Sequence, residues 1–266
     1  MASKVKSNKQ VAALLVLLGL SIWPSSLGAA RSSRCSEARE RQMDTCASHV
    51  AFLGDHGFRV PQNASAASNF CEQLADSINC LQAYSRECLR AGLARQVLGG
   101  MMRRAKQQRS QICADERAKR EFVTKMECLR GDKIEALHAC ADASIARYEL
   151  VRAKLAPDAK LAALCCSYQI FRRDAELALE GACTRSAPAN ELVMRAVASA
   201  AGELLNLACD NLRSLAECQS SERTRDVQRQ LELTSRQVRE GQLKPGAKSL
   251  IPILLDILDA SAGPSP

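Results

Sequence analysis

The chain has 266 residues, 13 cysteines, a formal net charge of +8 and only 3% aromatic residues. This mild positive charge comes without the dense basic face and base-stacking aromatic side chains of nucleic-acid-binding domains, so it does not suggest a nucleic-acid partner. The length is enough for one or two domains with hydrophobic cores of their own.

Residues 1–30 have the pattern of a secretory signal peptide. Three lysines precede the apolar run "VAALLVLLGLSIW", and the small residues Gly28 and Ala30 suit positions −3 and −1 of a cleavage site. The run is shorter than the roughly 20 residues of a membrane-spanning helix. We therefore expect cleavage after Ala30, a secreted, extracellular product and no transmembrane anchor after cleavage.

The rest of the chain has the periodicity of amphipathic helices. In "ELVMRAVASAAGELLNLAC" apolar residues recur every three or four positions, and no stretch shows the alternation typical of strands. Good helix formers dominate the composition. The predicted fold class is all-α, a disulfide-stapled helical bundle. Breaks between helices are expected at residues 54–65, 129–133, 154–160, 184–190 and 240–249.

The cysteines fall into two similar series, and in an exported chain they are expected to form disulfides. The first series has intervals of 11, 25, 17 and 25 residues, and the second has intervals of 12, 26, 17 and 26. This agreement predicts an internal duplication into two three-helix modules, residues 31–125 and 126–221, followed by a helical tail, 222–266. The two series are Cys35, Cys46, Cys71, Cys88, Cys113 and Cys128, Cys140, Cys166, Cys183, Cys209.

Helical geometry predicts how the cysteines pair in the first module. At 100° per residue Cys35 and Cys46 share one helix face, and an antiparallel hairpin places Cys88 and Cys80 opposite them in a better register than Cys71 would have. Cys71 is then left for a third helix. The predicted bonds are Cys35–Cys88, Cys46–Cys80 and Cys71–Cys113.

The same scheme extends to the second module with one gap. Ala175 occupies the position equivalent to Cys80, so Cys140 loses its partner and is expected to remain a free thiol. A rival pairing joins Cys140 to Cys165 and frees Cys218. The favoured bonds are Cys128–Cys183, Cys166–Cys209 and, by elimination, Cys165–Cys218.

The sequence contains no recognisable catalytic constellation. The adjacent pair Cys165 and Cys166 suggests the C-C-x-x-H-D helix of secreted phospholipases, but Gln169 and Ile170 replace the base and the calcium ligand. The histidines form no H-E-x-x-H motif, and no Ser-His-Asp or Cys-His arrangement has local support. We therefore expect no enzymatic activity, no cofactor and no metal. The three histidines are His49, His56 and His138.

Arg130, Gly131 and Asp132 spell the integrin-ligand tripeptide, which has a structural alternative that we favour. Gly131 suits the position that ends a helix, and Asp132 with Glu135 has the spacing of a capping box. An integrin ligand is therefore the less favoured function.

Asn63 begins "NAS", the only N-x-S/T sequon of the mature chain, and is expected to carry an N-glycan. Before the apolar C-terminal helix, a charged helix at 221–240 has a thin apolar stripe and is expected to be loosely attached. The apolar helix at 249–260, with Ser249 as its N-cap, is expected to pack on the core, or alternatively to meet a partner or a lipid surface.

The stretches "NFCEQLADSINCLQAYSRECL" and "ALCCSYQIFRRDAELALEGAC" resemble secreted, cysteine-rich helical proteins of arthropods related to the haemolymph glycoproteins. The resemblance covers residues 35–218. It implies an extracellular location and no established chemistry. Such proteins often have a further cysteine near the end of the second stretch, where this chain has Asp174 and Ala175.

Two classes of function follow. The chain is expected to be a secreted binding or carrier protein for an extracellular protein or an apolar small molecule, or else a structural or defensive component acting through protein contacts. An apolar cavity lined by residues such as Leu192, Val197 and Leu204 would favour a carrier, whereas a packed interior with an exposed apolar patch would favour partner binding.

Overall fold

Ten α-helices and two short 3-10 helices account for most of the residues that the computed structural model describes, which are 35–183, 188–209, 212–220 and 222–261. The all-α prediction is confirmed. The predicted signal peptide, residues 1–30, lies outside the described residues. The elements are α2 (Glu37–Ala51), α3 (Ala64–Glu87), α4 (Leu93–Ile112), α5 (Glu116–Lys125), η1 (Glu127–Leu129), η2 (Gly131–Ile134), α6 (Glu135–Lys154), α7 (Pro157–Ala182), α8 (Pro188–Ala208), α9 (Leu215–Ser220), α10 (Glu222–Arg239) and α11 (Ile251–Ser261).

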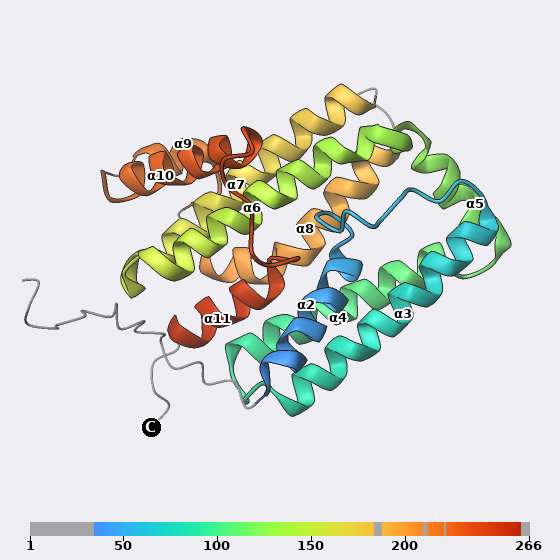
Figure 1. Cartoon of the computed structure of the whole chain (residues 1–266), viewed down its shortest axis with the longest axis horizontal. Coiled ribbons are helices and arrows are strands. Elements are labelled where there is room, and N and C mark those ends of the chain that lie inside the picture. The colour runs from blue at the N-terminus through green and yellow to red at the C-terminus, as the bar shows by residue number, and fades with distance from the viewer. Residues whose placement is uncertain (1–34, 184–187, 210–211, 221, 262–266) are drawn as a thin grey trace, which may run out of the picture. The chain divides into compact units, whose positions relative to one another are not determined.

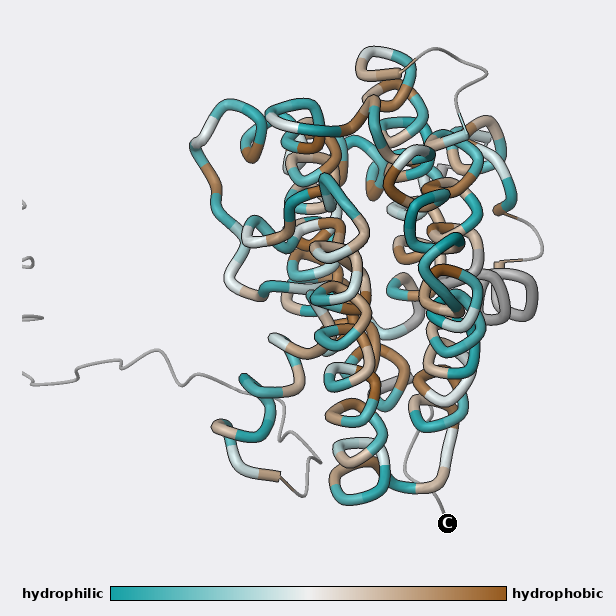
Figure 2. The backbone as a smooth tube through the Cα atoms, turned by 90° about the vertical axis from the view of Figure 1, so that its right-hand side faces the viewer, coloured by the Kyte–Doolittle hydropathy of each residue, from teal (hydrophilic) through white to brown (hydrophobic). Residues whose placement is uncertain are grey.

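Local sequence explains where several helices begin. Ser36, Asn63 and Asp115 each accept a hydrogen bond from a backbone N–H three residues later, which satisfies one of the unpaired donors of the first helical turn. Pro157 opens α7, where the missing N–H of proline costs nothing. Polar and apolar residues then alternate along each helix with helical periodicity (Figure 2).

Two antiparallel hairpins organise the bundle (Figure 1). In one, α2 packs on α3, and α4 and α5 cover the other side of α3. In the second, α6 packs on α7, and α8 covers α7. Helix α11 returns from the end of the chain to contact α2, α4, α6 and α7, so it lies where the two groups of helices meet.

The hydrophobic core runs through both groups of helices. One large cluster joins Leu81 and Leu98 to Leu164 and Ile253, and a second joins Phe122 to helices α6, α7 and α8. Apolar residues from both predicted modules therefore share the same clusters. In the part of the chain that the structure describes, no helix combines the length and the apolar character that crossing a bilayer takes.

The expectation that α10 is loosely attached is wrong. This helix packs along α6 and α7, and it buries Leu231, Thr234 and Ser235. Leu231 joins the hydrophobic core, and the Ser235 hydroxyl adds a polar contact, because it accepts a hydrogen bond from the buried Arg147 guanidinium of α6. A search for apolar stripes does not count such a contact.

Helix α11 packs into the core as expected, with Ile251, Ile253 and Leu254 buried. Ser249, however, does not cap it, because its hydroxyl has no hydrogen-bond partner. The Asp44 carboxylate of α2 instead accepts hydrogen bonds from the backbone N–H groups of Lys248 and Ser249, each at 2.8 Å.

Six disulfides cross-link the helices. Four join the pairs that helical register predicts: Cys35–Cys88, Cys46–Cys80, Cys71–Cys113 and Cys128–Cys183. The expected bonds Cys166–Cys209 and Cys165–Cys218 are corrected, because the structure exchanges the partners. It joins Cys165 to Cys209, with Cα atoms 5.7 Å apart, and Cys166 to Cys218, at 5.8 Å.

The exchange follows from the geometry of α7. Neighbouring residues on a helix point about 100° apart, so Cys165 and Cys166 face different sides. Cys165 belongs to the cluster shared with the end of α8, and Cys166 to the cluster that contains Cys218 of α9. Spacing alone did not distinguish these two sides.

Candidate functional site

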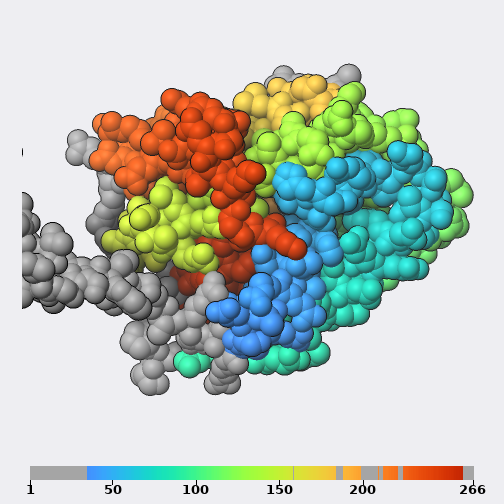
Figure 3. Space-filling model, in the orientation of Figure 1, coloured from blue at the N-terminus to red at the C-terminus, as the bar shows by residue number. Residues whose placement is uncertain are grey.

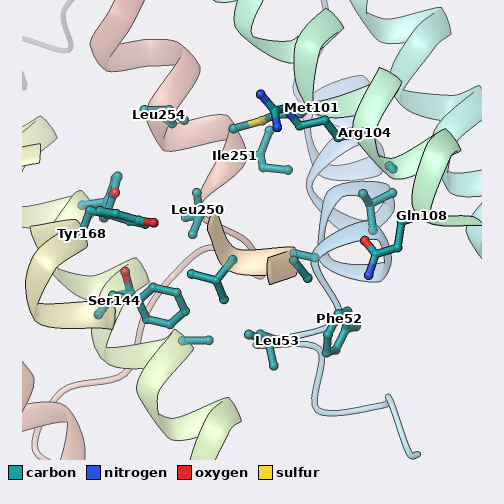
Figure 4. Close-up of a pocket in the computed structure, with 18 of the residues that line it drawn as sticks. Phe52, Leu53, Met101, Arg104, Gln108, Ser144, Tyr168, Leu250, Ile251 and Leu254 are labelled. Atoms are coloured by element: carbon teal, nitrogen blue, oxygen red, sulfur yellow. The ribbon is translucent and has the colours of Figure 1, made fainter. Parts of the chain in front are cut away.

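An apolar cavity of about 130 Å³ lies where the two groups of helices meet (Figure 4). Helices α2, α4, α6, α7, α8 and α11 all contribute to it, together with the loop that follows α2. Most of its lining is hydrocarbon. Representative residues of the wall are Val50, Leu53, Leu164, Phe171, Val197 and Ile251.

The loop after α2 forms one wall of the cavity through Phe52 and Leu53. Gly54 follows in the left-handed region, with φ +89°, and its N–H donates to Nδ1 of His138 on α6 at 3.1 Å. A Cβ atom on Gly54 would lie 3.3 Å from that of Ala141, so a side chain there would meet both strain and crowding. The loop is thereby held against α6.

The segment between α10 and α11, residues 240–250, crosses the face of the molecule from α10 toward α2 (Figure 3). The Glu149 carboxylate accepts hydrogen bonds from the N–H groups of Gly246 and Ala247 at 2.9 Å, in addition to the contacts of Asp44 described above. The Arg152–Asp256 ion pair, at 3.0 Å, fastens α11 itself. We call residues 240–250 the strap. These contacts hold the strap and α11 in place, so that Leu250 of the strap and Leu254 of α11 line the cavity.

A few polar groups interrupt the apolar lining. Ser144 and Tyr168 lie on one side of the cavity, and Arg104 and Gln108 of α4 lie on the opposite side (Figure 4). The Ser144 side chain is buried, and its hydroxyl has no hydrogen-bond partner. Burial raises the pKa of Tyr168, so its phenol remains protonated at neutral pH.

His138 of α6 lies beside the loop after α2, which contains His56 and follows His49 at the end of α2. The ring of His56 lies 5.2 Å from that of His138, and its Nε2 is 2.9 Å from a carboxylate oxygen of Asp142. Burial, and secondarily the charge of His56, lowers the pKa of His138. Among the described residues no three His, Cys, Asp or Glu side chains are grouped as a metal site.

A second polar cluster lies between α6, α7 and α10. Arg147 is fully buried and donates to the hydroxyl of Ser167 at 3.1 Å and to that of Ser235 at 2.6 Å, with Asp174 at 3.9 Å. Burial lowers the pKa of Arg147 to about 10, so the guanidinium is still charged at neutral pH. This cluster joins three helices and lines no part of the cavity.

Cys140 is the free cysteine of the described chain. Its thiol donates to the backbone oxygen of Asp174 at 3.4 Å, next to Ala175, which is fully buried. Burial raises the pKa of Cys140 to about 11, and the nearby Asp174 carboxylate adds to this effect. Since the thiolate is the reactive form, this thiol is chemically inert at neutral pH.

Asn63 is exposed, and its side-chain oxygen caps α3. In the Arg130-Gly131-Asp132 sequence, Arg130 folds back to donate to Glu127 and to the Val123 carbonyl. The expected capping box is wrong. Residues 131–134 form a 3-10 turn, and α6 begins after Ile134 without a side-chain cap.

Of the three residues that the sequence suggested for a cavity wall, one lines the cavity. Val197 lines it, Leu192 lines a separate void of about 20 Å³, and the side chain of Leu204 lies outside what the structure describes. Sequence reasoning missed Ser144. Its signal was a hydroxyl at helical spacing within an apolar stripe formed by Ala141, Ile145 and Tyr148.

Comparison of the chain with protein-family models, with curated proteins and with solved structures finds no match.

Proposed function

We propose that this chain is a secreted, non-enzymatic carrier that binds a small apolar molecule in the cavity between its two groups of helices. The cavity itself carries this proposal. Its volume of about 130 Å³ is close to the roughly 150 Å³ of a dry, apolar engineered cavity that binds benzene. A ligand of about that size would gain the free energy of leaving water without requiring a new site to form.

The cross-links support a preformed site. Three disulfides leave α7, which provides Leu164, Tyr168 and Phe171 to the wall, and they tie it to η1, α8 and α9. A wall fixed in this way loses little conformational freedom when a ligand binds, which favours affinity.

The exposed apolar surface gives no support to the alternative, a structural or defensive protein that acts through protein contacts. Large apolar side chains that reach solvent in the described chain are leucines on four different segments: the start of α4, α7, α10 and the strap. Exposed leucines are ordinary on a protein surface and do not by themselves indicate a docking patch. The fold of Arg130 onto its own chain likewise weighs against integrin binding.

The extracellular location is part of the proposal and rests on the signal pattern of residues 1–30, together with six disulfides, which persist in oxidising compartments. Asn63 is exposed and would carry an N-glycan. Glycosidase treatment of protein from a eukaryotic host would then lower its mass, and an unchanged mass would refute the glycan. The resemblance to arthropod haemolymph glycoproteins agrees with this location.

The disulfides also support the proposed duplication. Cys35–Cys88 and Cys128–Cys183 span 53 and 55 residues, and Cys71–Cys113 and Cys165–Cys209 span 42 and 44. In the proposed duplication Cys165, and not Cys166, corresponds to Cys71, because Cys165 bonds Cys209. The Cys166–Cys218 bond is then an addition of the second half.

Filling the cavity tests the carrier function. Val197 lines the cavity, and the larger ring of Val197→Phe would occupy part of it. We expect the wild-type protein to bind benzene, measured by ligand-observed NMR, and the variant to lose this binding while it keeps its stability to within about 1 kcal/mol.

Val193 provides the matched control, because it lies one turn earlier on α8, is fully buried and does not line the cavity. Val193→Phe should lower the free energy of unfolding by about 1–3 kcal/mol through overpacking. No binding of benzene to the wild type, or equal binding to wild type and Val197→Phe, would contradict the proposed site.

A further inference from the structure

Ser144 differs from several other helical hydroxyls of the described chain. A hydroxyl on a helix usually satisfies itself by donating to the carbonyl one turn back. Thr45, Ser68, Thr234 and Ser235 all do so, with oxygen–oxygen distances of 2.9–3.2 Å to the residue four positions earlier. The Ser144 hydroxyl makes no such bond.

The position of Ser144 suggests what its hydroxyl is for. The side chain is only 1% exposed and lines the cavity, where its neighbours on the wall include Ala141, Leu164 and Phe171. A buried hydroxyl without a partner is unfavourable, because it has lost its hydrogen bonds to water and gained none in return. A ligand atom in the cavity would supply the missing partner.

The surroundings limit the chemistry of that partner. Among the described residues of the lining there is no carboxylate, and the tyrosine hydroxyls of α6 and α7 remain neutral because burial raises the pKa of both Tyr148 and Tyr168. Arg104, the one cationic side chain among the described lining residues, lies on the opposite wall (Figure 4). A serine hydroxyl can donate and accept, so a neutral hydroxyl or carbonyl group can pair with it without bringing a charge into the apolar cavity.

We infer that the natural ligand is a small, neutral, mostly hydrocarbon molecule with one hydroxyl or carbonyl oxygen, which hydrogen-bonds to the Ser144 hydroxyl. This inference rests on the proposed carrier function and specifies its ligand class. The hydrocarbon part fills the apolar volume, and the oxygen fixes the orientation of the ligand in the cavity.

The experiment compares phenol with benzene as probes, with affinities measured by ligand-observed NMR on the full mature protein. In Ser144→Ala we expect phenol to bind about tenfold more weakly, the effect of about one lost hydrogen bond, while the affinity for benzene stays the same or rises. The ratio of the two affinities within each variant cancels differences in how the variants fold or pack.

Ser249→Ala is the matched control. Ser249 is also 1% exposed with an unpartnered hydroxyl, but it does not line the cavity, so its loss should leave both affinities unchanged. Because the hydroxyl of Ser144 is unpartnered, Ser144→Ala should fold with an unchanged or higher melting temperature.

The outcomes separate the two proposals. If wild-type protein binds both probes and Ser144→Ala changes neither, or weakens both equally, the inference is overturned while the carrier function stands. If neither probe binds the wild type, the carrier function fails as well.

Discussion

The α2–α3 hairpin and the α6–α7 hairpin are fastened by different means. Two disulfides, Cys35–Cys88 and Cys46–Cys80, join the first pair of helices. No disulfide of the described chain joins α6 directly to α7: Cys128–Cys183 ties the end of α7 to η1, and Cys140 of α6 faces Asp174 and Ala175. Instead, the buried Arg147 of α6 donates hydrogen bonds to Ser167 of α7 and to Ser235 of α10. This polar network and the packing of α10 join the two helices without a disulfide.

The two hairpins are therefore stabilised in different ways. A disulfide stabilises mainly by restricting the unfolded chain, whereas a buried charge stabilises only while each of its partners is in place. The α6–α7 half should therefore be the more sensitive to point substitutions, and the substitutions below test this.

Arg147→Met should have the largest effect. It removes a fully buried guanidinium, leaves the hydroxyls of Ser167 and Ser235 without their donor and removes a positive charge near Asp174. We expect the free energy of unfolding, measured in urea, to fall by about 3 kcal/mol. Arg147→Lys keeps the charge but loses the planar donors, so its free energy of unfolding should lie between those of the wild type and Arg147→Met. If Arg147→Met lowered the free energy of unfolding by less than about 1 kcal/mol, the Arg147 network would not be what holds α10.

Ala175→Cys should turn the second hairpin into a copy of the first. Ala175 adjoins Asp174, whose backbone oxygen is 3.4 Å from the Cys140 sulfur, so the new thiol should oxidise with Cys140. The number of free thiols would fall to zero and the free energy of unfolding would rise by about 2 kcal/mol. Two free thiols in the oxidised variant would argue against the equivalence of Ala175 and Cys80.

The contact that links the two halves, Gly54 N–H to His138, should depend on pH. Burial keeps the pKa of His138 below its ordinary value of 6.5, so under acidic conditions the unfolded chain binds a proton that the folded protein resists. The stability is therefore fully present above pH 6.5 and declines as the pH falls below it. His138→Asn, which keeps an acceptor for Gly54, should have a weaker pH dependence in thermal melts. An unchanged pH profile would exclude His138 as the group responsible.

The smallest effect is expected when the thiol of Cys140 is challenged with an alkylating reagent, because this thiol is unreactive in the folded protein. Burial raises its pKa to about 11, and iodoacetamide should not label it in the native protein at neutral pH. In the denatured, unreduced protein the label should appear on Cys140 alone. A label on Cys218 would contradict the pairing seen in the structure, and a label on any cysteine of residues 35–113 would contradict the pairing of the first half.

The sequence predicts a disulfide where the spacing of cysteines along two antiparallel helices decides the pairing. It does not predict a contact that depends on which neighbouring helix a side chain faces. Cys46 and Cys80 could be paired from helical spacing, but Cys165 and Cys166 differ only by the turn of one residue on α7. Helix α10 is attached both by Leu231 of its apolar stripe and by a hydrogen bond between Ser235 and Arg147, and no apolar pattern indicates the second contact.

The cavity was only partly predictable for a related reason. Apolar stripes show which residues face the interior, and Val197 was identified in this way. They do not show where packing between helices leaves space. That depends on the loop after α2, held by Gly54 and His138, and on α11, which returns from the far end of the chain. Ser144 could have been noticed as a polar residue within an apolar stripe.

The most direct test of the carrier function is native mass spectrometry of the mature protein purified from its source. We predict a retained ligand that gives a discrete added mass beyond that of the glycosylated chain, is released on denaturation, and is a small neutral molecule with few oxygens. Native protein whose mass equals that of the denatured chain, and which also takes up neither benzene nor phenol, would contradict the account.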